Sequence, residues 1–404
     1  MDAATIERIR EGMAFEAQRK APPEGFPELP DIPAGRYTDP AFLDLEDERL
    51  WKRSWLYAGH RDQVPNNGDW FLTRSTGSPI LVVRDSGGTI RAYYNTCRHR
   101  GAPLVKADKG SDRGFVCGYH GWSYTLEGKL VAVRDKRDFV GLDFSCQSLI
   151  PVRCETLGGW IFINEDPEAE DLITALGPVA RELQQFQPDS LTLVDSRGYD
   201  VACNVKVLLD AFLEVYHLKS IHQETVDRFL DHRGTTITLW PGGHSRMTTP
   251  NRRPDWVDPG TIGMPEIDTV TEIPRTSNVS YYIFPNIVMP PSASGMPMLV
   301  FWPTSKRTMR IECHWFSPPF GPEGRNPLWD KRIANFERIL DEDLQFAPQI
   351  QESLESPGFK GMTLCYQERR IYHYHEEIDR RIGLNRLPAE LRVEPKLEPW
   401  VEPA

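Results

Sequence analysis

Cys97-Arg98-His99 is followed, within the same stretch of chain, by Cys117-Gly118-Tyr119-His120. Each segment offers one thiolate and one imidazole, so together they supply two sulfur and two nitrogen ligands. This set suits one [2Fe–2S] cluster whose two irons carry unlike ligands, because histidine in place of cysteine removes negative charge and raises the reduction potential. The pattern therefore predicts an electron-transfer centre formed by Cys97, His99, Cys117 and His120.

Short strands and glycines beside the two segments support this interpretation. Arg91–Thr96 and Phe115–Val116 are expected strands that lead into the two loops. Gly101 and Gly121 permit tight turns, so the backbone can approach the sulfur atoms closely. A structural zinc site is the alternative, because zinc also binds cysteine and histidine, but its ligand pairs are usually spaced more widely than the first of these pairs.

A second group of candidate ligands lies in the apolar segment that ends at His222. A helix is expected over about 206–221, and four polar side chains would then fall on one stripe of it, namely Lys206, Asp210, Glu214 and His217. A polar stripe is often only a solvated face, but the other positions are so apolar that the helix is expected to be buried. A buried row of acids and histidine then needs a partner.

His217 and His222 lie on different sides of an ideal helix. Both reach one ion only if the helix unwinds or bulges between them, and such breaks favour functional sites. Two neutral imidazoles and one carboxylate, with open positions left for O₂, are the ligand set of non-haem iron(II) oxygenases. Together with the upstream cluster motif, the histidine pair predicts a mononuclear iron(II) site.

Both motifs resemble the large (alpha) subunit of the Rieske non-haem iron oxygenases, an aromatic-ring-hydroxylating dioxygenase-like family. The resemblance extends from about Tyr37 to Arg381. In the second motif the family pattern is Asn-Trp-Lys, an acid, then Glu or Asp-x-Tyr-His-x-x-x-x-His, and it is matched here by Asn204, Lys206, Asp210, Glu214, Tyr216, His217 and His222. Val205 stands where the family usually has tryptophan, which affects packing at the helix start rather than the ligands.

The resemblance implies a third iron ligand from a late helix, in a Glu-Asp-x₇-Gln pattern that Glu342, Asp343 and Gln351 match. Asp343 is the expected carboxylate ligand. Asp341 is the alternative ligand, and a solvated acidic patch without any ligand is the other interpretation of this segment.

Glu214 matches the family's bridging carboxylate, which links a cluster histidine of a neighbouring subunit to an iron histidine. A carboxylate that holds the outer N–H of a ligating imidazole also fixes its tautomer and orientation. The alternative is an ordinary buried glutamate paired with Lys206 or Lys219. Because cluster and iron within one chain of this family lie too far apart for fast transfer, the resemblance implies a head-to-tail homotrimer, with or without small beta subunits.

The activity implied by the resemblance is that of a terminal oxygenase component. It would take electrons from a separate NAD(P)H-dependent reductase or ferredoxin and use O₂ to hydroxylate, dihydroxylate or demethylate a small organic substrate, with an aromatic compound expected. Candidates for the lining of the substrate pocket are Asp210, Ala211, Leu218 and Ile339. A Rieske-type electron-transfer protein without oxygenase activity is the alternative, which the large second half of the chain disfavours.

Composition excludes several other classes of protein. The chain of 404 residues has a formal net charge of −11 and no basic run, so nucleic acid is not an expected partner. No apolar stretch reaches the length of a membrane span, and residues 1–20 contain no signal-peptide core, so no membrane partner and a cytoplasmic location are expected. Five scattered cysteines are expected to be buried free thiols, namely Cys146, Cys154, Cys203, Cys313 and Cys365.

The order of expected elements predicts an α+β fold in three parts. Residues 1–36 form an N-terminal helical arm, residues 37–165 an antiparallel β Rieske [2Fe–2S] domain, and residues 166–404 a mononuclear non-haem iron catalytic domain. In the last part an antiparallel sheet is flanked by helices, expected at about 206–221, 329–354 and 364–381.

Overall fold

The computed structural model describes residues 1–253 and 255–403. The chain forms two compact units. The β unit is Trp51–Ala175, and the mixed unit combines Met1–Leu50 with the chain from Leu176 onward. None of the helices in the described ranges is both long enough and apolar enough to cross a bilayer.

The boundaries of the β unit differ from the expected range of residues 37–165. Residues 37–50 belong to the mixed unit, because Tyr37 and Phe42 are fully buried there and α3 (Pro40–Arg49) contacts α11 (Arg369–Ile382). The expected N-terminal arm also belongs to this unit, since α1 (Ala3–Gln18) contacts two strands of its sheet.

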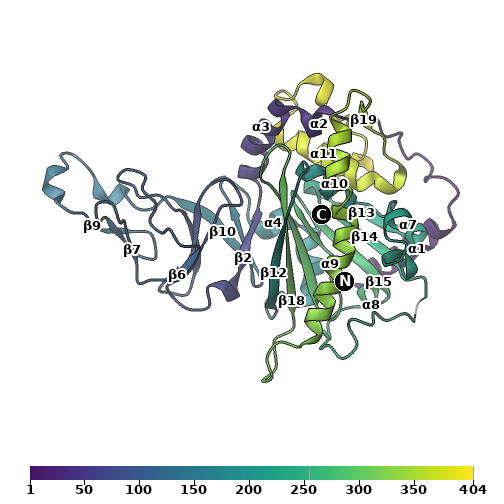
Figure 1. Ribbon diagram of the computed structural model, residues 1–404, viewed down its shortest axis with the longest axis horizontal. Helices are drawn as coiled ribbons and strands as arrows, with labels where there is room; N and C mark the ends of the chain where they lie inside the picture. Colours follow the sequence, from purple (N-terminus) through teal and green to yellow (C-terminus); the bar gives the residue numbers. More distant parts are fainter. Residues whose placement is uncertain (254, 404) are drawn as a thin grey trace. The chain divides into compact units, whose positions relative to one another are not determined.

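The β unit contains an antiparallel sheet of seven strands in the order β2-β11-β10-β5-β4-β3-β6, and a separate sheet of three strands, β7-β8-β9 (Figure 1). The strands are β2 (Leu56–His60), β3 (Asp69–Thr73), β4 (Ile80–Arg84), β5 (Ile90–Tyr94), β6 (Lys109–Ser111), β7 (Phe115–Val116), β8 (Ser123–Tyr124), β9 (Leu130–Ala132), β10 (Pro151–Leu157) and β11 (Trp160–Asn164).

Alternation along these strands separates two apolar cores. Trp70 of β3 belongs to one core and its neighbour Phe71 to the other, because successive side chains of a strand point to opposite faces. The core that contains Trp70 also contains Cys97 and Cys117. The two cysteine-histidine loops are therefore anchored in the apolar interior of the β unit.

The mixed unit is built on an antiparallel sheet of seven strands in the order β12-β18-β17-β16-β15-β14-β13. Its strands are β12 (Thr192–Val201), β13 (Thr236–Leu239), β14 (Ser245–Pro250), β15 (Ser277–Ile283), β16 (Ile287–Met289), β17 (Met296–Pro303) and β18 (Met309–Ser317). Together with the helices beside it, this sheet confirms the α+β fold class.

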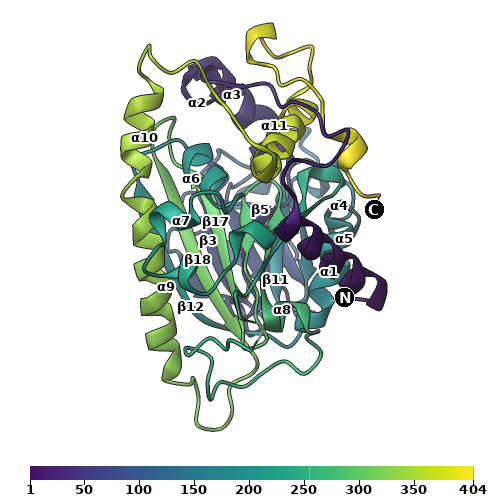
Figure 2. The same cartoon turned by 90° about the vertical axis from the view of Figure 1, so that its right-hand side faces the viewer.

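Helices near the sheet position the candidate ligands. α6 (Val205–Ala211) contacts β17, α9 (Leu328–Leu344) and α10 (Ala347–Leu354), as Figure 2 shows from the side. The single helix expected over 329–354 is thus two helices. Pro348 lies in the first turn of α10, and because proline has no N–H it cannot continue the hydrogen-bond ladder of α9.

The scattered cysteines are only partly buried. Cys203 and Cys313 are buried, as expected, but Cys146 and Cys365 are exposed. The expectation that all five are buried was therefore wrong.

Candidate metal centres

The two cysteine-histidine loops of the β unit have the same backbone construction. In each, the cysteine N–H donates to the carbonyl oxygen five residues later, at 2.9 Å for Cys97 and 2.8 Å for Cys117. The N–H groups of Gly101 and Gly121 donate back to the two cysteine carbonyls. Both glycines have positive φ, +72° and +75°, a region that other residues rarely adopt. The sequence thus folds into two matching turns, each presenting one cysteine and one histidine.

In these turns the two cysteine side chains share one apolar core, and the two histidine rings lie beside each other. Cys97 and Cys117 are each 2% exposed in the same apolar core. The rings of His99 and His120 have their centroids 4.5 Å apart, and His99 stacks on Trp122 at 4.9 Å. A pair of thiols beside a pair of imidazoles fits a two-iron cluster in which one iron takes sulfur and the other takes nitrogen ligands.

The electrostatics of this site also fit metal ligation. Burial raises the pKa of the Cys97 thiol, and the neighbouring Cys117 adds to this effect. Burial lowers the pKa of His99, which favours the neutral imidazole. The buried Nδ1 atom of His99 has no hydrogen-bond partner among the described residues. Iron cations would stabilise both thiolates and use the neutral imidazole nitrogens, so these residues fit a [2Fe–2S] group.

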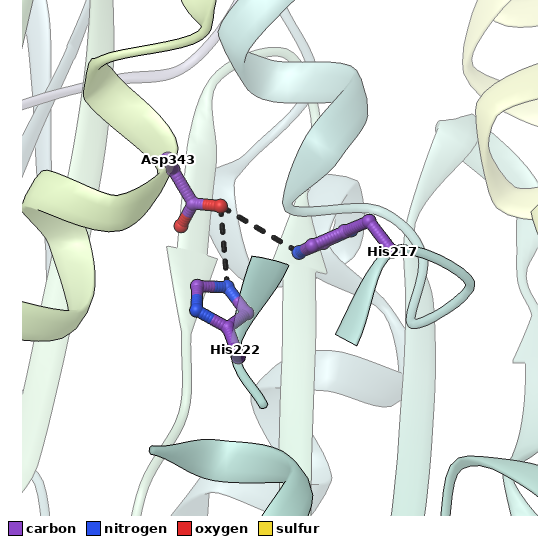
Figure 3. Close-up of side chains that lie close together, drawn as sticks. All are labelled: His217, His222 and Asp343. Carbon is purple, nitrogen blue, oxygen red and sulfur yellow. Dashed lines mark ion pairs between the residues drawn. The ribbon is translucent and has the colours of Figure 1, made fainter. Parts of the chain in front are cut away.

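In the mixed unit His217, His222 and Asp343 converge (Figure 3). Oδ1 of Asp343 lies 3.6 Å from Nε2 of His217 and 3.2 Å from Nε2 of His222. One ligand atom from each residue lies within 4.8 Å of the others. Two imidazoles and one carboxylate of this kind suit iron(II). Asp341, the alternative ligand, is exposed and is not a member of this group.

The helix expected over 206–221 is interrupted, but not where the sequence analysis placed the break. α6 ends at Ala211 and α7 (Leu218–Ile221) begins after His217. His217 and His222 therefore flank the single turn of α7 as its N-cap and C-cap. The prediction of an unwound or bulged turn between the two histidines was wrong, because the chain leaves the helix before the first of them.

Glu214 shapes the turn that leads into α7. Its carboxylate accepts the backbone N–H groups of Tyr216 and His217, which lie beyond the end of α6 at Ala211. The proposed stripe of four polar residues is consequently split, with Lys206 and Asp210 on α6 and Glu214 outside it. Lys206 pairs with Glu46 at 2.6 Å, both fully buried in the mixed unit, rather than with Glu214.

A carboxylate holds the outer nitrogen of each imidazole. Glu214 Oε1 contacts Nδ1 of His217, and Glu342 Oε2 lies 2.7 Å from Nδ1 of His222. Because a carboxylate only accepts hydrogen bonds, Nδ1 carries the proton in both rings and each Nε2 presents a lone pair toward Asp343. Two lone pairs facing a carboxylate are unfavourable unless a proton or a metal cation lies among them, and two imidazoles with one carboxylate are a ligand set that fits a metal ion.

The pKa directions show how the surrounding carboxylates act on the two imidazoles. Burial opposes the charged imidazolium of His217, but the hydrogen bond with Glu214 and the charges of Glu214 and Asp343 outweigh burial, so the pKa of His217 is raised. The pKa of His222 is raised in the same way, against burial, by Asp343 and Glu342. The carboxylates therefore make this position favourable for positive charge.

The contact between Glu342 and His222 was not foreseen from the sequence. Glu342 was recognised only as part of the Glu-Asp pattern, and the two residues are 120 positions apart. The sequence feature that pointed to Glu342 was its position directly before Asp343. This position does not show which imidazole nitrogen the Glu342 carboxylate contacts.

The four candidate pocket residues lie in different surroundings. Asp210 is buried and accepts a hydrogen bond of 2.6 Å from the Tyr37 hydroxyl. Leu218 packs in a small apolar cluster with Val215 and Met247. Ala211 and Ile339 are half-buried.

Comparisons with known protein families match both units. The family described as Rieske [2Fe-2S] domain matches residues 54–146, and the family described as Ring hydroxylating alpha subunit (catalytic domain) matches residues 188–384. The biphenyl 2,3-dioxygenase subunit alpha of Rhodococcus jostii (strain RHA1) is 36% identical over 201 residues, which are 47% of this chain and 44% of that protein. The chain thus aligns with less than half the length of this relative.

Other relatives match over more of the chain. The chloroplastic choline monooxygenase of Arabidopsis thaliana is 25% identical over 363 residues, covering 85% of this chain and 81% of that protein. Among solved structures, a quaternary ammonium Rieske monooxygenase has a TM-score of 0.75 at 21% identity and covers 90% of this chain and 100% of that chain. Naphthalene 1,2-dioxygenase from Rhodococcus sp. has a TM-score of 0.71 at 21% identity, with 94% and 98% covered.

A β domain with a cysteine-histidine cluster site, joined to an α+β domain with a His-His-Asp site, defines the class of Rieske non-haem iron proteins. The two family matches together cover most of the chain, in the order that this class requires. The chain belongs to the Rieske oxygenase alpha-subunit family.

Proposed function

We propose that this chain is the terminal oxygenase component of a multicomponent Rieske oxygenase. The observation that carries the proposal is the convergence of His217, His222 and Asp343 in a chain that also has a complete set of cluster ligands. A protein that only transfers electrons needs no second metal site, so this convergence favours the oxygenase over the electron-carrier alternative.

The side chains that would hold the two metal groups are Cys97, His99, Cys117 and His120 for the [2Fe–2S] cluster, and His217, His222 and Asp343 for the mononuclear iron(II). When bound, the cluster would supply electrons one at a time and the iron(II) would supply the site at which O₂ is activated. The chain's own contribution is to position these ligands and to bind the substrate beside them.

Glu214 is proposed to have two roles. It fixes the tautomer of His217 through the Nδ1 contact. It also lies next to Tyr216, whose side chain is 63% exposed, so this part of the mixed unit is open to an approaching surface. We infer that a cluster histidine of a neighbouring subunit approaches Glu214 there, in a head-to-tail homotrimer, and that the carboxylate bridges the two centres.

The electrons are proposed to come from a separate NAD(P)H-dependent reductase or ferredoxin. The sequence has no Gly-x-Gly-x-x-Gly fingerprint after a strand with which the chain itself would bind the nicotinamide cofactor. Small beta subunits are compatible with the proposal but are not required by it.

The substrate is proposed to be a small organic compound, with an aromatic compound as the first candidate. The relative with 36% identity is named a biphenyl dioxygenase, whereas the choline monooxygenase aligns over more of the chain at 25% identity. Quaternary amines are therefore the second class to test. Asp210, Ala211, Leu218 and Ile339 remain the proposed lining of the pocket.

A product screen tests the proposal. Purified protein with a surrogate reductase, NADH and ¹⁸O₂ is incubated with aromatic acids, methoxyarenes and quaternary amines, and products are identified by mass spectrometry. Incorporation of ¹⁸O or substrate-dependent demethylation is expected, and it should disappear in Asp343→Ala. Reduction of the cluster without any product, together with the absence of mononuclear iron from the wild-type protein, would instead support the electron carrier.

A further inference from the structure

The imidazole of His222 is held on both of its nitrogens by consecutive residues of one helix. Glu342 Oε2 lies 2.7 Å from Nδ1, and Asp343 Oδ1 lies 3.2 Å from Nε2. Both carboxylates project from the last turns of α9. His217 is held differently, because the carboxylate on its Nδ1 is that of Glu214, three residues earlier in its own turn.

Thr225 fixes the Glu342 carboxylate in this arrangement. Its hydroxyl donates to Oε2 of Glu342 at 2.7 Å, whereas its distance to the carbonyl oxygen of His222 is 3.4 Å. The N–H of Thr225 donates to the same carbonyl at 3.1 Å, and the residue is 5% exposed. One oxygen of Glu342 therefore receives both the imidazole N–H of His222 and a buried hydroxyl from the turn that follows it.

We propose that Glu342 and Thr225 are positioning residues that hold the imidazole of His222 ready to bind iron(II). The inference rests on the proposed function, since it assumes that His222 is an iron ligand. A carboxylate on the far nitrogen fixes the tautomer and the ring direction and makes the ligating nitrogen more basic. Thr225 contributes by keeping the carboxylate from turning away toward solvent.

The structure separates this role from that of a solvated acidic patch. Glu342 has 22% of its side chain exposed and contacts His222 and Thr225. Its neighbour Asp341 carries the same charge on the same helix but is exposed. A solvated patch has no fixed hydrogen-bond partners, whereas the positioning role depends on the contacts of Glu342 with His222 and Thr225.

Iron binding to the two matched variants tests the proposal. Protein that keeps its cluster but has been depleted of mononuclear iron is titrated anaerobically with Fe²⁺, and the dissociation constant of the mononuclear site is measured. The visible absorption of the cluster serves as an internal check of intact protein. Glu342→Ala is expected to weaken Fe²⁺ binding about 10- to 100-fold, with the cluster spectrum unchanged. Asp341→Ala is expected to bind like the wild type. Equal affinity in Glu342→Ala and wild type, or equal losses in both variants, would overturn the role of Glu342.

A second pair of variants tests Thr225 with less risk to folding. Thr225→Val keeps the shape of the side chain but removes the hydroxyl, and it is expected to weaken Fe²⁺ binding severalfold. Thr225→Ser keeps the hydroxyl and is expected to bind Fe²⁺ with wild-type affinity. Wild-type affinity in Thr225→Val would overturn the role of Thr225. A wild-type protein that binds no mononuclear iron at all would contradict the proposed function itself, so the two failures are distinguishable.

Discussion

The cluster site of the β unit and the His-His-Asp site of the mixed unit are built in opposite ways. The proposed cluster ligands lie on two matching turns that are close in sequence and are closed by their own backbone hydrogen bonds. The second site joins the turn of α7 to the end of α9, across 120 residues in the case of His222 and Glu342. The first site is thus local and the second is tertiary, so each should be removable without the other.

The largest expected effect is loss of the cluster in His120→Ala. Removing one of four ligands should abolish the visible spectrum of the cluster, because the imidazole pair is broken, while mononuclear iron remains near its wild-type level. Absorption spectroscopy and metal analysis on the same sample measure both. An intact cluster spectrum would remove His120 from the ligand set.

The converse variant tests the tertiary site. Asp343→Ala should lose mononuclear iron and all product formation, because Asp343 Oδ1 is the atom that both imidazoles face, yet the cluster spectrum should persist. Unchanged iron content would reject Asp343 as a ligand. Loss of both metal groups in either variant would show that the two sites are not independent of each other.

The mixed unit should also have a pH dependence that comes from Asp210. Burial raises the pKa of Asp210 from 3.8 to about 7, although the hydrogen bond from Tyr37 and the charges of Lys206 and Arg36 act in the opposite direction. The native state then binds this proton more tightly than the unfolded state. The stability that the group contributes is therefore fully present below the unfolded pKa and is lost as the pH rises through the folded pKa.

Asp210→Asn removes this titration while keeping an oxygen that can accept from Tyr37. The free energy of unfolding of the variant minus that of the wild type should increase by about 2–3 kcal/mol between about pH 5 and pH 8, because each unit of pKa shift corresponds to about 1.4 kcal/mol. Chemical denaturation of both proteins across this range provides the measurement. A difference between the two free energies of unfolding that does not change with pH would contradict a raised pKa for Asp210 in the folded protein.

Glu214→Ala addresses the link between the two sites. At saturating Fe²⁺ both metal groups should still be bound, but product formed per electron consumed should fall about 10- to 100-fold, because the carboxylate on His217 is lost. Lys219→Ala, at an exposed position on the same segment, is the matched control. Near-normal coupling in Glu214→Ala would refute the bridging role.

The smallest expected effect concerns the cluster alone. Tyr124 Oη accepts the N–H of Arg98 at 3.1 Å and lies 3.3 Å from Sγ of Cys97, so its hydroxyl would donate to the sulfur when Cys97 is a thiolate ligand of the cluster. Tyr124→Phe should lower the midpoint potential by about 20–60 mV, the equivalent of one hydrogen bond in a one-electron couple. Tyr93→Phe, in the same core, should leave the potential unchanged in redox titration. An unshifted potential in Tyr124→Phe would exclude the hydrogen bond.

The local site was largely predictable from sequence because its determinants are adjacent residues. Gly101 and Gly121 follow the cysteines at the positions where positive φ is required. Strands β3 and β4 were also predictable, since their apolar residues form short continuous runs between turn residues.

The tertiary features were less predictable. β12 contains Asp195, Ser196, Arg197 and Gly198, which have little strand preference, and it forms because it pairs along its length with β18. The turn that leads into His217 is held by one side chain, Glu214, whose carboxylate accepts two backbone N–H groups. Likewise, the contact between Glu342 and His222 follows from how α9 packs, which no local pattern encodes.

Mössbauer spectroscopy of ⁵⁷Fe-enriched protein, reconstituted anaerobically, distinguishes a protein with two iron centres from one with a single centre. We expect two kinds of iron in one polypeptide, an iron pair with unlike ligands and a separate high-spin ferrous ion that disappears in Asp343→Ala. A spectrum with a single kind of iron environment would contradict this expectation.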